Sequence, residues 1–457
     1  MTSLHCPSAL LPNGWFRNVR LEIEYEGSIV SVESGVAEFG AERAAGPVIP
    51  GMPNLHSHSF QRALAGRTER AGPSSDDFWT WRDAMYQFVD RVDPEALQAV
   101  TAWLYADMLK SGYTSVGEFH YLHHGPEGVA YDDPAEMSHQ IVAAAKATGI
   151  GLTHLPVLYA YSGFGEEPPN ASQQRFVCDS DLLFRIVDAI AKPTAEDTQF
   201  AIGIAPHSLR AISEDMLEDA LSALNKSYPD APIHMHIAEQ LSEVEDCVLN
   251  TGMRPVAWAL DNLDISERWC LIHATHLAGT EISRLANSGA VVGLCPTTEA
   301  NLGDGVFPAR PFLDAKGRFG IGSDSHISVD PAEELRLLEY AQRLLYRHRN
   351  MLQTEEQPSV GAALYTEALK GGAQALARPI GEIAVGKRAD LVVLDSENIM
   401  LTEFEGDAIL DALVFAAGAG LVKDVMVGGQ WMVQDRRHHD EEALTAAARK
   451  ALQRTLS

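Results

Sequence analysis

The sequence predicts an α/β protein: a (β/α)8 barrel with a small composite β-sandwich domain formed by both chain ends. Three observations predict this architecture. Between residues 50 and 379, apolar strand-like runs alternate with long helical stretches, which is typical of parallel β/α units. Short strand-like runs return at both ends of the chain. Residues with metal and proton chemistry follow several of the barrel runs, where a closed barrel would gather them.

Residues 1–49 are expected to form the N-terminal part of the β domain. Residues 15–23 roughly alternate apolar and polar side chains, and residues 27–32 repeat the pattern after a turn. Alternation with a period of two indicates a strand with one buried face. We therefore expect short paired strands before the barrel begins.

Residues 50–379 are expected to form the barrel. Helices are predicted over residues 95–110 and 135–147, and a helix over residues 360–377 would close the barrel. Eight strand–helix units within about 330 residues match a barrel with insertions. The eight strand-like runs end near His58, Glu118, Pro156, His207, Glu239, His273, Pro296 and Asp324.

Residues 380–457 return to the strand pattern. Strands are expected within residues 383–395 and 422–433, and an Ala-rich helix is expected over residues 441–456. These C-terminal strands are predicted to pair with the N-terminal ones, which would place both chain ends in one domain.

The composition indicates an ordinary globular protein with a strongly acidic surface. Hydrophobic residues make up 46% of the chain, and the formal net charge is -28. Such a charge repels nucleic acid and anionic membranes, so neither is expected as a partner. No segment is long and apolar enough to span a bilayer. The five cysteines are scattered without a Cys-x-x-Cys pair, which favours a reducing, cytoplasmic location.

Four separate segments carry residues suited to a metal ion. His56 and His58 lie two apart on a predicted strand, so both imidazoles point to the same face. His236 follows at the end of the fifth run, and Asp324 ends the eighth. Such a set can hold Zn2+ in a tetrahedral site. His234 shares the face of His236 but lies deeper in the strand, so we expect it to be a hydrogen-bonded core histidine.

The order of these segments resembles the amidohydrolase superfamily: His-x-His after strand one, His after strands five and six, and Asp after strand eight. The resemblance covers essentially the whole chain, including the split β domain and the stretch at residues 386–391. It implies an amidohydrolase-type, distorted barrel. The fourth run, residues 202–207, lacks the lysine that bridges two metals in some members. Together with His236-Ile237-Ala238-Glu239, this favours the branch of one-metal deaminases, with one Zn2+ per chain and Fe2+ as the alternative.

This resemblance implies a hydrolytic mechanism. Zn2+ lowers the pKa of a coordinated water, so that hydroxide is available near neutral pH. His273 and Asp324 are expected to orient and deprotonate that water. Glu239 is expected to deliver a proton to the departing nitrogen, so that ammonia can leave.

Several distinctive segments resemble the formimino-L-glutamate deiminases of histidine degradation. These segments are residues 59–63, 78–83, 118–123, 205–210 and 295–305. The resemblance implies hydrolysis of N-formimino-L-glutamate to N-formyl-L-glutamate and ammonia by a homodimeric enzyme. It also implies that five residues contact the substrate: Gln61, Arg82, Tyr121, His207 and Arg210.

The chemistry of such a substrate supports this hypothesis independently. A dicarboxylate needs local positive groups on a chain of net charge -28, and a guanidinium can bind a carboxylate through two parallel hydrogen bonds. Arg82 and Arg210 lie in segments expected at the mouth of the barrel.

Two alternatives stay open. A deaminase of a purine, pyrimidine or related ring amidine would need aromatic groups, and Trp79, Trp81, Tyr86 and Phe88 could supply them. A non-catalytic scaffold is the second alternative. It is disfavoured because proteins of that kind usually lose ligands, whereas this chain keeps every expected ligand and both proton-transfer candidates.

Overall fold

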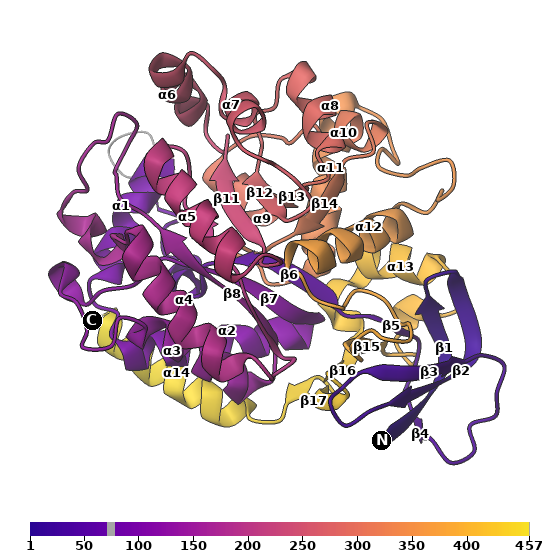
Figure 1. Cartoon of the computed structure of the whole chain (residues 1–457). Helices are drawn as coiled ribbons and strands as arrows, with labels where there is room; N and C mark the ends of the chain where they lie inside the picture. The colour runs from indigo at the N-terminus through magenta and orange to yellow at the C-terminus, as the bar shows by residue number, and fades with distance from the viewer. Residues whose placement is uncertain (71–77, 457) are drawn as a thin grey trace.

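The computed structural model describes residues 1–70 and 78–456. A barrel of strands surrounded by helices occupies most of the molecule, and a β domain built from both ends of the chain lies at one side (Figure 1). This is the architecture that the sequence predicts. The division at residues 49/50 and 379/380 stays a prediction.

Eight consecutive segments of parallel strand form the barrel. Every residue of the first, second, third, fifth and sixth segments is buried, as expected for strands covered on both faces. Two curled sheets are joined by bridges between Ser57 and Asp324 and between Ile204 and Ile233, which close the ring. The strands are β6 (Met52–Ser57), β7 (Tyr113–His120), β8 (Gly151–Leu158), β9 and β10 (Phe200–Ile202 and Ala205–Pro206), β11 (Ile233–Ile237), β12 (Trp269–His273), β13 (Val291–Leu294) and β14 (Arg318–Ile321).

Helices cover the outside of these strands. The α2 helix shows how the sequence sets the bounds: Asp93 caps its N-terminus by accepting a hydrogen bond from the backbone N–H of Ala96 at 2.8 Å, and Gly112 ends it with a φ of 100°. The helices are α1 (Phe78–Val89), α2 (Pro94–Ser111), α3 (Glu136–Thr148), α4 (Ser180–Thr194), α5 (Glu214–Ser227), α6 (Leu241–Thr251), α7 (Pro255–Asn262), α8 (Gly279–Asn287), α9 (Pro296–Leu302), α10 (Ala309–Asp314), α11 (Pro331–Tyr346) and α12 (Val360–Ala375).

The predicted helices over residues 95–110, 135–147 and 360–377 correspond to α2, α3 and α12, with ends shifted by at most two residues. Short 3-10 turns occupy several of the connections, among them η1 (Ser59–Leu64) and η3 (Ala171–Phe176). Across residues 1–70 and 78–456, no helix combines the length and the apolar content needed to cross a membrane.

The β domain is hydrogen-bonded as one nine-stranded sheet that joins the two chain ends. Strands β5 and β15 pair antiparallel at its centre, with N-terminal strands on one side and C-terminal strands on the other. Gly428 and Gly429 form the two-residue turn between β16 and β17, where both residues adopt positive φ. The strands are β1 (Thr2–Leu11), β2 (Gly14–Ile23), β3 (Ile29–Glu33), β4 (Glu42–Arg43), β5 (Val48–Pro50), β15 (Leu391–Leu394), β16 (Val422–Val427), β17 (Gln430–Gln434) and β18 (Arg437–His438).

The last helix, α14 (Glu441–Thr455), leaves the sheet and lies along α2 on the barrel (Figure 1). Arg454 forms ion pairs with Asp93 at 2.8 Å and Glu95 at 3.0 Å, and Lys110 pairs with Glu441. The chain therefore passes from the β domain back to the barrel at its end.

Candidate active site

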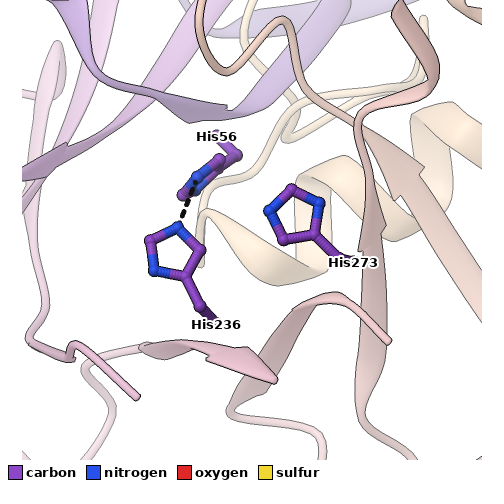
Figure 2. Close-up of side chains that lie close together, drawn as sticks. All are labelled: His56, His236 and His273. Atoms are coloured by element: carbon purple, nitrogen blue, oxygen red, sulfur yellow. Dashed lines mark hydrogen bonds between the residues drawn. The ribbon is translucent and has the colours of Figure 1, made fainter. Parts of the chain in front are cut away.

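Histidines from three barrel strands meet at the ends of those strands. His56 lies on β6, His236 lies on β11, and His273 is the last residue of β12. Figure 2 shows the three imidazoles facing a common point, with Nε2 of His236 3.0 Å from Nε2 of His56. His58, just after β6, brings a fourth ring, whose centroid is 4.6 Å from that of His56. Because parallel strands end at the same rim of a barrel, distant sequence segments converge here.

Asp324 adds an oxygen to this group from the segment after β14. Its Oδ1 lies 3.5 Å from Nε2 of His56 and 3.4 Å from Nε2 of His58. Ligand distances of about 2.0–2.1 Å place the donor atoms of a tetrahedral zinc site about 3.3 Å apart. Three separations, His56 to His236 and Asp324 to His56 and His58, are 3.0–3.5 Å and match that spacing. The donor atoms of His56, His58 and Asp324 lie within 4.8 Å of one another, as do those of His56, His236 and His273, so the two groups share His56 and suit a metal ion.

The charges of these groups suit a cation. Burial lowers the pKa of His56 to about 3 and also lowers the pKa values of His58 and His236, so all three imidazoles are neutral. Burial acts to raise the pKa of Asp324, but its hydrogen bond with His56 and the positive charge of His273 act in the opposite direction, and the carboxylate stays ionised. Nδ1 of His58 donates to the carbonyl of Phe119 at 2.9 Å, which leaves the lone pair of Nε2 for a ligand.

His234 lies on the same strand as His236 but away from this group. It is fully buried, and its Nε2 donates to the carbonyl oxygen of Ala375 at 2.7 Å. Its ring therefore ties β11 to the C-terminal end of α12.

Glu239 lies beside the candidate metal site, two residues after the end of β11. Burial raises its pKa to about 7, and the charge of His273 acts in the opposite direction. The carboxylate of Glu243, on α6, accepts hydrogen bonds from the backbone N–H groups of Ala238 and Glu239 at 3.0 Å each. Glu243 thus fixes the backbone that presents Glu239, and the sequence analysis did not identify it.

His273 is held between carboxylates. Nδ1 donates to Oε1 of Glu299 at 3.2 Å, while Nε2 faces Glu239 at 3.8 Å and Asp324 at 3.9 Å. Burial acts to lower the pKa of His273, but these three carboxylates outweigh it and raise the pKa to about 10. His273 is therefore a hydrogen-bond donor toward the space between Glu239 and Asp324.

The backbone of this rim is strained at several positions, among them three residues of the site or next to it. Ala238, His273 and Asp324 have φ values of 51°, 69° and 46°, in the left-handed region that favours glycine. Each such residue costs roughly 1–3 kcal/mol, and such strain persists where the surroundings impose it. Here it turns the chain sharply at the strand ends, so that the side chains point inward.

All five residues expected to contact substrate line one cavity with His58, His236, Glu239, His273 and Asp324. Gln61, on η1, donates to the hydroxyl of Tyr121 at 2.7 Å. His207 shares a 2.9 Å hydrogen bond with the hydroxyl of Ser208. The structure therefore brings the predicted residues together, while the assignment of a role to each one remains a prediction.

Other lining residues were not predicted as site residues: Met85, Tyr159, Phe176, Thr298, Leu302 and Ser325. Tyr159 directly follows β8, and its position at a strand end could have identified it. Trp81 and Tyr86, which the sequence analysis considered as aromatic groups for a ring substrate, also line the cavity. Phe88 is buried in the core, and the side chain of Trp79 lies outside the described part of the chain.

The sequence matches two known protein-family models. Residues 48–432 match the model of the amidohydrolase family, and residues 1–46 match the N-terminal domain of formimidoylglutamate deiminase HutF. The chain belongs to the amidohydrolase family.

Among its relatives in this family, the chain is 50% identical over 442 residues to a formimidoylglutamate deiminase of Pseudomonas aeruginosa, covering 97% of both proteins. It is 28% identical over 398 residues to a 5-methylthioadenosine/S-adenosylhomocysteine deaminase of Haloquadratum walsbyi, covering 86% of this chain and 81% of that protein. The crystal structure of an amidohydrolase from Brucella melitensis superposes with a TM-score of 0.94 at 46% identity, covering 100% of both chains.

Proposed function

We propose that this amidohydrolase catalyses the hydrolytic deimination of N-formimino-L-glutamate to N-formyl-L-glutamate and ammonia in histidine degradation. The observation that carries the proposal is the 50% identity to a formimidoylglutamate deiminase along 97% of both chains. The N-terminal match to a formimidoylglutamate deiminase domain agrees with it. The cavity, which combines a candidate metal site with two arginines, suits a dicarboxylate that carries an amidine.

The cofactor in this proposal is a single Zn2+ held by His56, His58, His236 and Asp324. Three neutral imidazoles and one carboxylate support it, with His56 3.0 Å from His236 and Asp324 3.4–3.5 Å from His58 and His56. Fe2+ accepts the same ligands and is the alternative. When bound, the ion would supply Lewis acidity that makes a water molecule acidic near neutral pH.

Side chains of this protein can carry the protons that move during the reaction. As water attacks the formimino carbon, a C–O bond forms and one proton passes to Glu239, which then carries it to the imino nitrogen. Asp324 accepts the second proton from the new hydroxyl group and passes it to the same nitrogen. The C–N bond to that nitrogen then breaks, and ammonia leaves with both protons of the water. His273 is charged, so it orients the attacking oxygen by donating a hydrogen bond and does not deprotonate the water as the sequence analysis expects, while Asp324 accepts a hydrogen bond from that oxygen. The formyl product keeps the oxygen.

Arg82 and Arg210 are proposed to bind the substrate carboxylates. Both line the cavity, and the charges of both act on His207, whose ring is 5.0 Å from that of His236. A guanidinium can bind a carboxylate through two hydrogen bonds, and such pairing in a partly buried cavity fixes orientation. Gln61 and Tyr121 supply further polar groups near His58.

One assay tests the proposed function. Ammonia release should be measured in parallel on formiminoglutamate, guanine, cytosine and adenosine. We expect formiminoglutamate to be turned over fastest by a wide margin. Faster turnover of any of the three bases would reject the assignment and would favour the deaminase of a ring amidine.

Two further properties belong to the proposal. We infer a homodimer from the family resemblance alone, and a monomeric mass in solution would reject it. We also infer a cytoplasmic location, which is supported by five buried cysteines without a disulfide bond. Fractionation of the producing cells would test it, and recovery with secreted proteins would contradict it.

A further inference from the structure

A buried glutamine connects two tyrosines at the end of the cavity that lies away from the candidate metal site. Gln173, on η3, is fully buried. Its Nε2 donates to the hydroxyl of Tyr159 at 2.7 Å and to the hydroxyl of Tyr86 at 3.3 Å. Because both oxygens contact one nitrogen, they lie within about 6 Å of each other.

The orientation of this amide is determined by its other hydrogen bond. Oε1 of Gln173 accepts a hydrogen bond from the backbone N–H of Asn170 at 2.9 Å, as part of the capping of η3. Rotating the amide by 180° would place an NH2 group against that N–H, where two donors would face each other. Nε2 must therefore face the tyrosines.

It follows that both phenol oxygens act as acceptors toward Gln173. Each hydroxyl then has its own proton to donate in another direction. Within the described part of the chain, neither Tyr86 nor Tyr159 donates to a protein acceptor. Both residues line the cavity, so a ligand bound there can accept a hydrogen bond from each hydroxyl group.

The two arginines surround this pair. The guanidinium of Arg82 lies 5.4 Å above the ring of Tyr86, and the charges of both Arg82 and Arg210 reach the hydroxyl of Tyr159. The ring of Phe176 packs against both tyrosines, at 5.8 Å from Tyr86 and 6.1 Å from Tyr159. Two phenol donors beside two guanidinium groups form a site for an anion.

The position of Tyr86 and Tyr159 indicates which of the two substrate carboxylates they bind. The ring of Tyr159 is 5.0 Å from that of His207, and the ring of His207 is 5.0 Å from that of His236. Tyr159 therefore lies two ring contacts from His236, and Tyr86 lies beside Tyr159 through their shared contact with Gln173. In formiminoglutamate, the side-chain carboxylate is the one farther along the chain from the formimino carbon.

We propose that Tyr86 and Tyr159 donate hydrogen bonds to the side-chain carboxylate of the substrate, and that Gln173 is a positioning residue that turns both phenol protons into the cavity. This inference rests on the proposed function. It identifies two substrate-binding residues and one supporting residue in addition to Arg82 and Arg210.

The test compares three substrates on the intact enzyme: formiminoglutamate, N-formimino-4-aminobutyrate, which lacks the α-carboxylate, and N-formimino-L-norvaline, which lacks the side-chain carboxylate. In Y86F and Y159F we expect about a tenfold higher KM on the first two substrates and an almost unchanged kcat. On N-formimino-L-norvaline we expect wild-type kcat/KM. Equal losses on all three substrates, or an unchanged KM on formiminoglutamate, would overturn the inference.

The Q173E variant tests the positioning role. A carboxylate at position 173 still accepts a hydrogen bond from the backbone N–H of Asn170. It also accepts hydrogen bonds from the two phenol hydroxyl groups, and this turns their protons away from the cavity. We expect its KM to rise about tenfold with kcat retained, and we expect no further rise when Q173E is added to Y86F/Y159F. An additional loss in that background would show that Gln173 acts through packing instead.

Tyr228→Phe is the matched control. Its hydroxyl donates to Asp188 at 2.6 Å, far from the cavity, so removing it should leave kcat and KM unchanged.

Binding of glutarate, measured by calorimetry, separates this inference from the proposed function. Weaker glutarate binding in Y86F and Y159F would support the carboxylate site even if the wild type released no ammonia from formiminoglutamate. Unchanged glutarate binding with normal wild-type turnover would reject the site alone.

Discussion

The two ends of the cavity are built from different parts of the fold. At the candidate metal end, the side chains come from β6, β11, β12 and the segment after β14, which the barrel joins edge to edge. At the other end, Arg82 and Tyr86 lie on α1, Gln173 lies on η3, and Arg210 follows β10 in a loop. One end is fixed by backbone hydrogen bonds between strands, and the other by side-chain contacts between a helix and loops.

This difference separates two requirements of the enzyme. A metal site needs its donor atoms placed to within a few tenths of an ångström, and adjacent strands supply that accuracy. Recognition of a particular substrate tolerates longer and softer contacts, and loops can change without disturbing the barrel. Changes at the strand ends should therefore abolish the reaction, whereas changes at the helix and loops should alter substrate capture.

The largest effect is expected at the metal end. His236→Ala should lose the bound metal and reduce kcat/KM by about 10⁴-fold, because several kcal/mol of transition-state stabilisation depend on the ion. His234→Gln is the matched control on the same strand. It should retain metal and activity while unfolding at a lower temperature, since it weakens the bond to Ala375. Metal analysis and thermal melting distinguish the two, and full metal content in His236→Ala would contradict the assignment.

Glu239→Gln should reduce kcat by about 10³-fold with little change in KM, because the carboxylate transfers a proton only during the reaction. Burial raises the pKa of Glu239 to about 7. The ionised form that accepts the proton therefore increases as the pH rises through that value, so wild-type kcat/KM should increase with pH between about 6 and 8. The residual activity of the variant should lack this rise. Glu245→Gln, an exposed site on α6, should behave as wild type.

Changes at the opposite end should be smaller and should affect KM. Arg82→Ala and Arg210→Ala should each weaken substrate capture by about 1.5–3 kcal/mol, the value of a lost hydrogen bond to a charged group. The kcat should change much less. Arg185→Ala, on the exposed surface of α4, provides a control with the same loss of charge. A fall in kcat with an unchanged KM would show that the two ends are not functionally separate.

The smallest effect is expected for Asp304→Asn, near the metal end. Burial, reinforced by the charge of Glu239, raises the pKa of Asp304 well above its ordinary value, so its carboxyl is neutral at pH 7. The neutral amide should keep kcat/KM within about threefold at pH 7. A carboxyl group whose pKa is raised in the folded state stabilises the fold at pH values below its pKa in the unfolded chain. This contribution is lost as the pH rises through the pKa of the folded state. The wild type should therefore lose stability between about pH 4 and pH 9, and the variant should lose less. Equal pH dependence would contradict a neutral Asp304.

The candidate metal end is the more predictable of the two because each of its residues lies at the end of a strand or just after it. A strand is recognisable from its local apolar run, and parallel strands bring their ends together wherever they lie in the chain. His56, His58, His236 and Asp324 can therefore be grouped from the amino-acid sequence alone. Even the choice between His234 and His236 follows from the position of each residue along one strand.

The opposite end is less predictable because it depends on loop conformation. Gln173 lies in a short 3-10 turn without periodic pattern, and its contacts with Tyr86 and Tyr159 join three separate segments. Glu243 and Glu299 support Glu239 and His273 from helices that follow the strands, and a carboxylate on an amphipathic helix resembles any solvated charge. Only the three-dimensional arrangement shows what these residues contact.

The closure of the barrel between β6 and β14 has a consequence for the order of events during synthesis. The backbone N–H of Asp324 donates to the carbonyl of His56 at 3.1 Å, and the N–H of His58 donates to the carbonyl of Asp324 at 3.1 Å. The first and last candidate ligands in the sequence are thus neighbours across the closing seam. A ribosome-bound chain that has exposed His236 holds all of its candidate histidine ligands but not the carboxylate. Metal capture at full affinity therefore waits until nearly the whole barrel has been translated, and a prematurely terminated chain cannot become a partly active hydrolase.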